Sequence, residues 1–172
     1  NYGAAPAAIR SFIHGTTVAT NVLLERRGAR TALIVTAGFR DVLQIGRQDR
    51  PSLYNWRMRR TDPLVPRHLR FEVRERMLHT GEVLTPLVEA DVATVAEQLR
   101  QAKVEAVAVC LLHSYANPSH EQTIGRLLTE ALPTLNVVLS ADILPEFKEY
   151  ERMNTTVVNA YVAPVMGLYL RG

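Results

Sequence analysis

The fold follows from the stretch Phe12-Ile13-His14-Gly15-Thr16-Thr17-Val18-Ala19-Thr20-Asn21 near the start of the chain. Its residue types predict the end of a buried strand, a tight turn at Gly15, two hydroxyl residues and the start of a helix. This layout points backbone N–H groups and threonine hydroxyls off a helix N-terminus, where an anion or a polar ligand is favoured. The alternative is structural: Gly15 permits the turn, and Thr16 or Thr17 caps the helix.

The residues around this stretch predict a β–α–β unit. We expect a strand over residues 9–14, a helix over residues 18–27 that ends with Gly28 at C′, and a continuous apolar strand, Arg30–Thr36. Parallel strands joined by a helix cross over with a right hand, so parallel pairing is expected. The sequence therefore predicts an α/β fold of mostly parallel β–α–β units, and we assign residues 9–50 to the first of them.

The next part, residues 51–88, is predicted to be an arginine-rich loop followed by an antiparallel hairpin. Apolar and polar side chains alternate over residues 71–77, Thr80-Gly81 is a turn signal, and residues 82–84 read as the returning strand. The loop is longer than a simple connection between two elements needs to be, and long loops at strand ends of α/β domains are often functional.

Residues 89–145 predict a second β–α–β unit preceded by its own helix. Residues 89–102 carry Val92, Val95, Ala96 and Leu99 on one helical face, and an apolar strand spans residues 104–112. Asn117-Pro118 then opens a helix, and residues 136–140 form a further strand.

The last part, residues 146–172, is predicted to be a helix, and Pro145 is expected to open it. Phe147, Asn154 and Tyr161 fall on its apolar face, and Pro164 is expected to end or kink it. Asn154 and Asn159 need hydrogen-bond partners if they are buried. Arg152 and the neighbouring glutamates are expected to form a solvated face.

Composition excludes several classes of protein. Apolar residues make up 47% of the 172 residues, which is typical of a globular chain with a core. No apolar run reaches transmembrane length and no segment resembles a signal peptide. The single cysteine, Cys110, lies in an apolar run and is expected to be a buried small side chain rather than a catalytic thiol. We therefore expect a cytoplasmic protein.

The net charge of +3 hides a local excess of arginine. Residues 47–76 contain nine arginines against four acidic residues. Because the basic character is local, the pI of 9.3 is a weak argument for nucleic acid, and we expect neither a nucleic-acid nor a membrane partner. A non-catalytic module that binds acidic partners through residues 57–74 is an alternative, which steeply salt-dependent binding would favour.

No standard catalytic motif is present, and the five histidines lack the spacing of metal ligands, so no metal site is expected. Three polar groups follow predicted strands, where α/β domains bind ligands. The groups are His14 with Thr16, Thr17 and Asn21, then Arg47 with Gln48 and Asp49, and finally His113 with Ser114 and Tyr115. The second group is alternatively a surface ion pair, and the third alternatively provides hydrogen bonds at a strand end.

Four longer motifs occur in order along the chain. Residues 14–25 contain H-G-T-T-x-A-T-N, and residues 38–48 contain G-F-R-D-x-L-x-I-G-R-Q. Residues 114–121 contain S-Y-x-N-P-x-H-E, and residues 144–162 contain L-P-E-F-x-E-Y-E-R followed by T-T-V-x-N-A-Y-V. This set resembles the N-terminal region of the hydantoinase A/5-oxoprolinase family, from about Phe12 to the end of the chain.

The resemblance implies a part of an actin/hexokinase-like ATPase fold. It implies that the whole protein uses ATP with Mg²⁺ to activate the carbonyl of a cyclic amide, such as a hydantoin or 5-oxoproline, for hydrolytic ring opening. Subunits of ATP-dependent ketone carboxylases are similar and are the alternative. The implied partners are the rest of the polypeptide and a hydantoinase B-type subunit or domain. The implied contacts to substrate or nucleotide are His14, Thr16, Thr17 and Asn21, with Arg47 and Asp49 shaping the same cleft.

One departure from the family limits this expectation. The family's first strand and its G-G-T-F-T-D-like phosphate loop do not occur in this sequence. We therefore expect a fragment of a larger enzyme and predict that the 172-residue chain alone neither hydrolyses ATP nor opens hydantoins. A coupled assay of ADP release checks this, and turnover by the isolated chain would contradict it.

Overall fold

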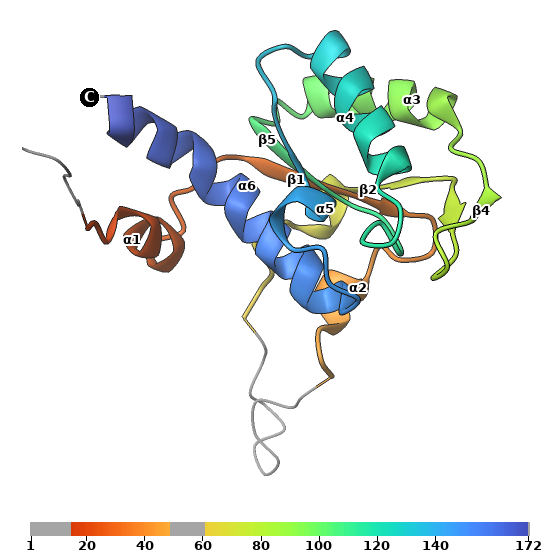
Figure 1. Ribbon diagram of the computed structural model, residues 1–172. Helices are drawn as coiled ribbons and strands as arrows, with labels where there is room; N and C mark the ends of the chain where they lie inside the picture. Colours follow the sequence, from red (N-terminus) through yellow and green to blue (C-terminus); the bar gives the residue numbers. More distant parts are fainter. Residues whose placement is uncertain (1–14, 49–60, 172) are drawn as a thin grey trace, which may run out of the picture.

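A four-stranded parallel sheet forms the centre of the computed structural model, which describes residues 15–48 and 61–171 (Figure 1). Its strands are β1 (Thr31–Thr36), β2 (Arg70–Val73), β5 (Ala106–Cys110) and β6 (Asn136–Leu139), in the order β2-β1-β5-β6. Every residue of the central strands β1 and β5 is buried, as expected for apolar strands covered on both faces. The predicted parallel α/β arrangement is confirmed, whereas the strand expected over residues 9–14 lies outside the described residues.

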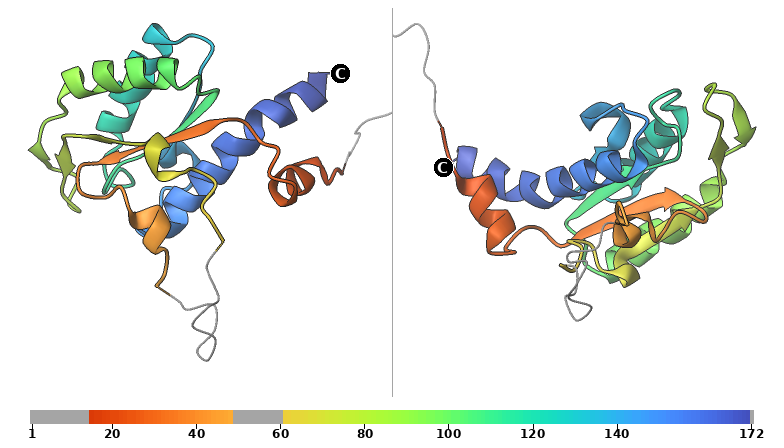
Figure 2. Two further views of the ribbon diagram at one scale, coloured as in Figure 1. Left: turned by 180° about the vertical axis from the view of Figure 1, so that it is seen from behind. Right: turned by 90° about the horizontal axis from the view of Figure 1, so that it is seen from below.

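Helices cover both faces of this sheet (Figure 2). The helices α3 (Glu89–Gln101) and α4 (Ser119–Ala131) pack together on one face, and the long helix α6 (Glu149–Arg171) crosses β5 and β6 on the other. The short helices α1 (Val18–Leu24) and α2 (Val42–Ile45) pack against α6. The predicted inner face of α3 is correct, because Val92, Val95, Ala96 and Leu99 are all buried.

The predicted hairpin is present, but its first strand is shorter than expected. Residues 70–73 form β2, which pairs in parallel with β1, and only β3 (Arg76–Met77) pairs with β4 (Val83–Thr85). The alternation of side chains continues through both strands, so the sequence pattern does not mark the point where the chain leaves the main sheet. The bidentate ion pair between Arg74 and Asp91 ties this point to α3, with nitrogen–oxygen distances of 2.6 and 2.8 Å.

Two predictions at the ends of helices are wrong. Gly28 is not the C′ residue of α1, which already ends at Leu24. Glycine is needed at this position for packing instead, because a Cβ atom on Gly28 would overlap the ring of Tyr161 on α6. The last helix begins at Glu149 rather than Pro145 and continues through Pro164, so Phe147 precedes it and is 66% exposed.

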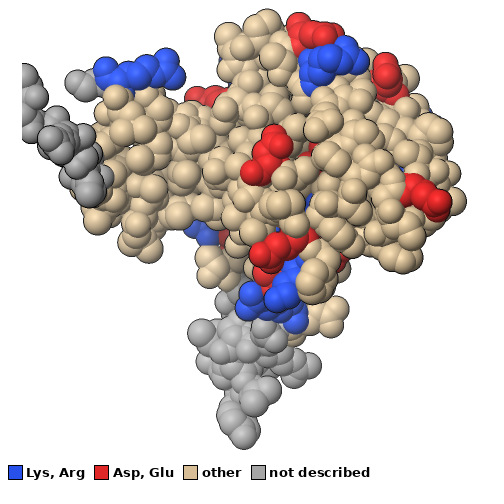
Figure 3. Space-filling view, viewed as in Figure 1, with Lys and Arg blue, Asp and Glu red and all other residues tan. Residues whose placement is uncertain are grey.

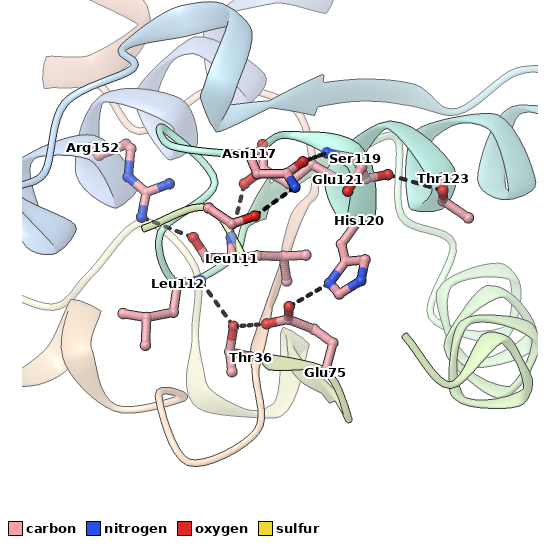
Figure 4. A network of polar contacts seen from close by, with 11 residues as sticks. Thr36, Glu75, Leu111, Leu112, Asn117, Ser119, His120, Glu121, Thr123 and Arg152 are labelled. Atoms are coloured by element: carbon pink, nitrogen blue, oxygen red, sulfur yellow. Dashed lines mark hydrogen bonds and ion pairs between the residues drawn. The ribbon is translucent and has the colours of Figure 1, made fainter. Parts of the chain in front are cut away.

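A buried polar network joins the carboxyl ends of the central strands to the helices on both faces (Figure 4). Its centre is Glu121 of α4, which is fully buried. One carboxylate oxygen accepts hydrogen bonds from the Leu111 N–H at 2.8 Å and the Ser140 hydroxyl at 2.7 Å. The other accepts from the Ala141 N–H at 2.9 Å, next to the start of α5 (Ser140–Ile143).

The positive charge in this network is Arg152 of α6, which is 1% exposed. Its guanidinium donates to the Leu111 carbonyl at 2.8 Å and to the Ser140 hydroxyl at 3.0 Å, and it also contacts the Ser114 hydroxyl. Leu111 and Ser140 therefore bridge Glu121 to Arg152. The expectation that Arg152 lies on a solvated face is wrong, because this face of α6 meets the end of β5.

A second branch of the network begins at Thr36, the last residue of β1. The Thr36 hydroxyl accepts a hydrogen bond from the Leu112 N–H at 2.9 Å and donates to Glu75. The other carboxylate oxygen of Glu75 lies 2.7 Å from Nδ1 of His120, the neighbour of Glu121 on α4. The two branches together provide hydrogen-bond partners for Thr36, Leu111 and Leu112, where β1 and β5 end.

We predict that Glu121→Gln destabilises the protein by roughly 1–3 kcal/mol, because both carboxylate oxygens accept from N–H or O–H donors and one buried donor would lose its acceptor. An amide nitrogen would face a donor in either orientation of the side chain. Urea denaturation of the purified protein measures the effect. The matched control is Glu130→Gln on the same helix, which breaks an exposed pair with Arg126 and should cost no more than about 0.5 kcal/mol. Equal losses in the two variants would contradict the prediction.

Candidate functional site

A groove of about 440 Å³ runs beside α6, on the face of the sheet opposite to α3 and α4. Three elements and one irregular segment form its walls. The lining residues are Leu23, Leu24 and Arg26 from the end of α1, Leu43, Gln44 and Gly46 from α2 and its C-cap, Thr61 to Leu64, and Tyr150 and Asn154 from α6. Half of these residues have apolar or aromatic side chains, and polar groups lie among them, as in many small-molecule sites.

One wall is fixed by a buried arginine. Arg70, 1% exposed, donates to the Gln44 side chain at 3.0 Å and to the Val65 carbonyl at 3.0 Å. Burial lowers the pKa of the Arg70 guanidinium, and the nearby Asp41 carboxylate opposes that effect. Asp41 itself accepts two hydrogen bonds from Arg67, which hold the pKa of its carboxyl below the usual value. These contacts fix Gln44 and α2 beside the groove.

The predicted site residue Arg47 lies next to the lining residue Gly46 and forms an ion pair with Glu151. The Arg47 Nε lies 2.7 Å from the Glu151 carboxylate, and this hydrogen bond lowers the pKa of Glu151. Glu151 follows the lining residue Tyr150 on α6, so the pair links the two sides of the groove. On the face shown in Figure 3, charged side chains gather near α2 and the start of α6, whereas the surface over the rest of α6 and α1 carries few.

Three further predicted site residues belong to α1 or precede it. Thr16, Thr17 and Asn21 are all exposed. The Thr16 hydroxyl accepts a hydrogen bond from the Val18 N–H at 3.2 Å, whereas Thr17 occupies the N-cap position without a capping bond from its side chain. The groove is lined by residues that follow Asn21 on the same helix rather than by these three. The remaining predicted residues, His14 and Asp49, lie outside the described part of the chain.

The third predicted polar group, His113-Ser114-Tyr115, provides hydrogen bonds at a strand end. Ser114 is buried in the network around Arg152, and His113 adopts a left-handed conformation with φ of 57° just after β5. Burial lowers the pKa of His113. Burial also raises the pKa of the Cys110 thiol to about 12, in agreement with a structural role for this cysteine.

Sequence reasoning missed Tyr150 as a groove residue and placed Asn154 on a buried face. Asn154 is exposed, and its side chain forms no hydrogen bond with another residue of the described ranges. A polar side chain on an otherwise apolar helix was the available signal, but the sequence pattern does not reveal which elements face that side chain. The same limit applies to the pairing of Arg152 with residues that follow β5.

Residues from two of the four sequence motifs line this groove, Gly46 from the second and Tyr150 from the fourth. Leu23, which also lines it, follows the first motif, which ends at Asn21. The third motif supplies Ser114, His120 and Glu121 to the buried network, which fixes α6 through Arg152. Some of the motif residues therefore line the groove, and others form the buried network that holds α6 beside it.

No group of three or more His, Cys, Asp or Glu side chains within residues 15–48 and 61–171 could hold a metal ion. No helix formed by these residues is long and apolar enough to cross a membrane.

Curated relatives match almost the whole chain. It is 39% identical over 160 residues to the caprolactamase subunit alpha of Pseudomonas jessenii, a match that covers 92% of this chain and 23% of that protein. It is 32% identical to the 5-oxoprolinase of Saccharomyces cerevisiae, a match that covers 94% of this chain and 14% of the yeast protein. The chain thus spans a quarter or less of the length of these relatives.

Two solved structures share the fold. The ATP-dependent caprolactamase from Pseudomonas jessenii matches 91% of this chain with a TM-score of 0.85 and 39% identity, over 23% of its own length. The nucleotide-free acetone carboxylase matches 86% of this chain with a TM-score of 0.78 and 33% identity, over 22% of its own length. These matches confirm the predicted fold class, a mostly parallel α/β unit with a hairpin that is part of an actin-like ATPase fold.

A family model described as the hydantoinase/oxoprolinase N-terminal region matches residues 1–132, which is more than half of the chain. The four motifs, the fold and the relatives agree with this match. The chain belongs to the hydantoinase/oxoprolinase family and represents the N-terminal region of that family.

Proposed function

We propose that the chain is part of an ATP-dependent hydrolase that opens a cyclic amide after phosphorylation of the amide carbonyl. The observation that carries this proposal is the similarity to the ATP-dependent caprolactamase, at 39% identity and a TM-score of 0.85 over 91% of the chain. The 5-oxoprolinase relatives support it, since 5-oxoproline is also a cyclic amide.

The proposed chemistry explains why ATP is needed. An amide is a poor electrophile, and transfer of the γ-phosphoryl group to its oxygen makes the amide carbon open to attack by water. The ring C–N bond can then break, with ADP and phosphate as the other products. In such reactions the protein mainly positions the reactants and stabilises charge.

This chain provides one wall of the proposed site, and we assign that wall to α1 and the turn after α2. The exposed hydroxyls of Thr16 and Thr17 are suited to donate hydrogen bonds to oxygen atoms of substrate or nucleotide. The proposed contacts are His14, Thr16, Thr17 and Asn21, with Arg47 and Asp49 beside them. The proposal also includes Mg²⁺ as the cofactor of ATP and a cytoplasmic location. The proposed partners are the rest of the polypeptide and a hydantoinase B-type subunit or domain.

The second candidate function is that of an ATP-dependent ketone carboxylase subunit. The match to acetone carboxylase and the 35% identity with the acetophenone carboxylase gamma subunit of Aromatoleum aromaticum favour it. Both identities are lower than that with caprolactamase, so ring opening is the first choice.

The test uses the full-length polypeptide that contains this chain, together with its partner subunit. We predict ADP release and ring-opened product with at least one of hydantoin, 5-oxoproline and ε-caprolactam, and neither product when ATP is omitted. Chromatography of the ring-opened product and a coupled ADP assay provide the two measurements. ATP-dependent turnover with a ketone and bicarbonate, and with no cyclic amide, would replace the first function by the second.

We predict that Thr16→Ala in the full-length protein lowers kcat for that reaction roughly tenfold or more, because a hydroxyl at the reacting groups is lost. The melting temperature should change little, since the only bond lost within the described chain is the exposed contact to the Val18 N–H. Thr94→Ala is the matched control, because Thr94 is also exposed and bonds only a backbone carbonyl on α3. Unchanged kcat together with reduced stability would assign Thr16 a capping role alone.

A further inference from the structure

We infer that the second half of α6, residues 162–171, is a docking helix that the rest of the full-length polypeptide covers on at least two sides. We call these residues the α6 arm. The side chains that decide this are Leu168 and Leu170, near the end of the helix. The docking surface is the same for a hydrolase and for a carboxylase, so it does not depend on the proposed function.

The α6 arm is apolar on every side. Residues 162–170 contain no charged side chain, and the hydroxyl of Tyr169 is their one polar side-chain group. This stretch makes more than two turns of helix, so its apolar side chains point in all directions. A helix that is apolar all round is normally buried inside a larger protein.

The described chain covers the arm only in part. All the buried residues of α6 lie between Arg152 and Tyr161. The arm extends beyond the sheet (Figure 2), and its Leu168 and Leu170 are 73% and 71% exposed. Residues two apart on a helix point to nearly opposite sides, because successive residues are turned by about 100°. Apolar surface is therefore exposed on two sides of the arm.

The other face of the sheet carries a surface that suits water. None of the exposed large apolar side chains of the described residues belongs to α3 or α4, and α4 carries the exposed ion pair of Arg126 and Glu130. On the α6 side, by contrast, Leu24 of α1 is exposed as well, and α1 packs against α6. Contiguous apolar surface of this kind marks a site of interaction. The distribution of exposed side chains therefore places a partner on the α6 side.

A hollow of about 540 Å³ beside the arm provides space for side chains of the docked segment. Ala163, Pro164 and Gly167 lie on its helical side together with Leu168. Residues just before β5 and at the start of β6 form the other side. The small residues of the helix leave this space open, and its volume is within the range that binds small molecules. It is therefore large enough to receive side chains of a docked segment.

The rest of the same polypeptide is the occupant that these observations favour. The match to the solved caprolactamase covers 23% of its length, so more than three-quarters of that chain lies outside the matched region. Segments of one polypeptide meet at a high effective concentration. A twofold contact with a second copy would pair one patch with itself and cover one side of the arm. Leu168 and Leu170 need cover on both sides, which an adjoining part of the polypeptide can provide.

The test uses the full-length polypeptide, purified without a partner subunit, and measures the rate at which a maleimide labels one introduced cysteine. Mass spectrometry of the labelled peptide identifies the site. We expect Leu168→Cys and Leu170→Cys to be labelled roughly tenfold or more slowly than Glu130→Cys, because a covered thiol reacts only when the structure opens locally. Glu130 is the matched control, since its side chain is 60% exposed and lies on α4, outside the docking surface. In concentrated urea the three variants should react at similar rates.

Slow labelling of both arm variants at every protein concentration supports the inference. Labelling of both at the rate of the control overturns the docking surface, and slow labelling of only one overturns cover on two sides. Protection that develops only at high protein concentration would assign the arm to a second copy. Protection that develops only after the partner subunit is added would assign the arm to that subunit. Either of these last two results overturns the assignment to the same polypeptide.

Discussion

The fully buried carboxylate of Glu121 is the contact on which the rest of the structure depends. Its three hydrogen-bond donors come from the end of β5 and from the start of α5, and Leu111 and Ser140 connect it to Arg152 of α6. One side chain of α4 thereby fixes a helix on the opposite face of the sheet. The desolvation of buried charged groups often cancels the free energy that their contacts provide, so we interpret this network mainly as a constraint on geometry.

That constraint reaches the groove through α6. The Arg152 side chain extends from α6 to the Leu111 carbonyl at the end of β5. Its neighbours Tyr150, Glu151 and Asn154 are therefore directed toward α1 and α2. A second buried arginine, Arg70, fixes the opposite wall through Gln44. Gly28 allows α6 to approach the chain between α1 and β1, because any larger residue there would overlap Tyr161. The groove is therefore bounded by three contacts that each orient one element.

Local patterns were sufficient to predict the sheet and its covering helices, but not the groove. Continuous apolar runs identified β1 and β5, and the spacing of Val92, Val95, Ala96 and Leu99 identified α3. In these elements, the residue types of the element alone are sufficient to predict which side chains are buried. Arg152 was misplaced because arginine is rarely buried without partners, and its partners come from elsewhere in the chain. The groove was missed for the same reason, since Leu23, Gly46 and Tyr150 meet only after folding. The resemblance named segments of the chain without revealing their arrangement.

The network also occupies the crevice at the carboxyl ends of the strands, where α/β proteins usually bind a ligand. At that edge the Thr36 hydroxyl and the Leu111 and Leu112 N–H groups are already bonded to groups of the protein. A ligand there would have to displace Glu75 or Glu121, both buried, and would leave His120 or the Leu111 N–H without its partner. In the groove, by contrast, Asn154 can form new hydrogen bonds without breaking any that the described chain makes. The polar groups at the strand ends hold α6 in place, and α6 in turn provides Tyr150 and Asn154 to the lining of the groove.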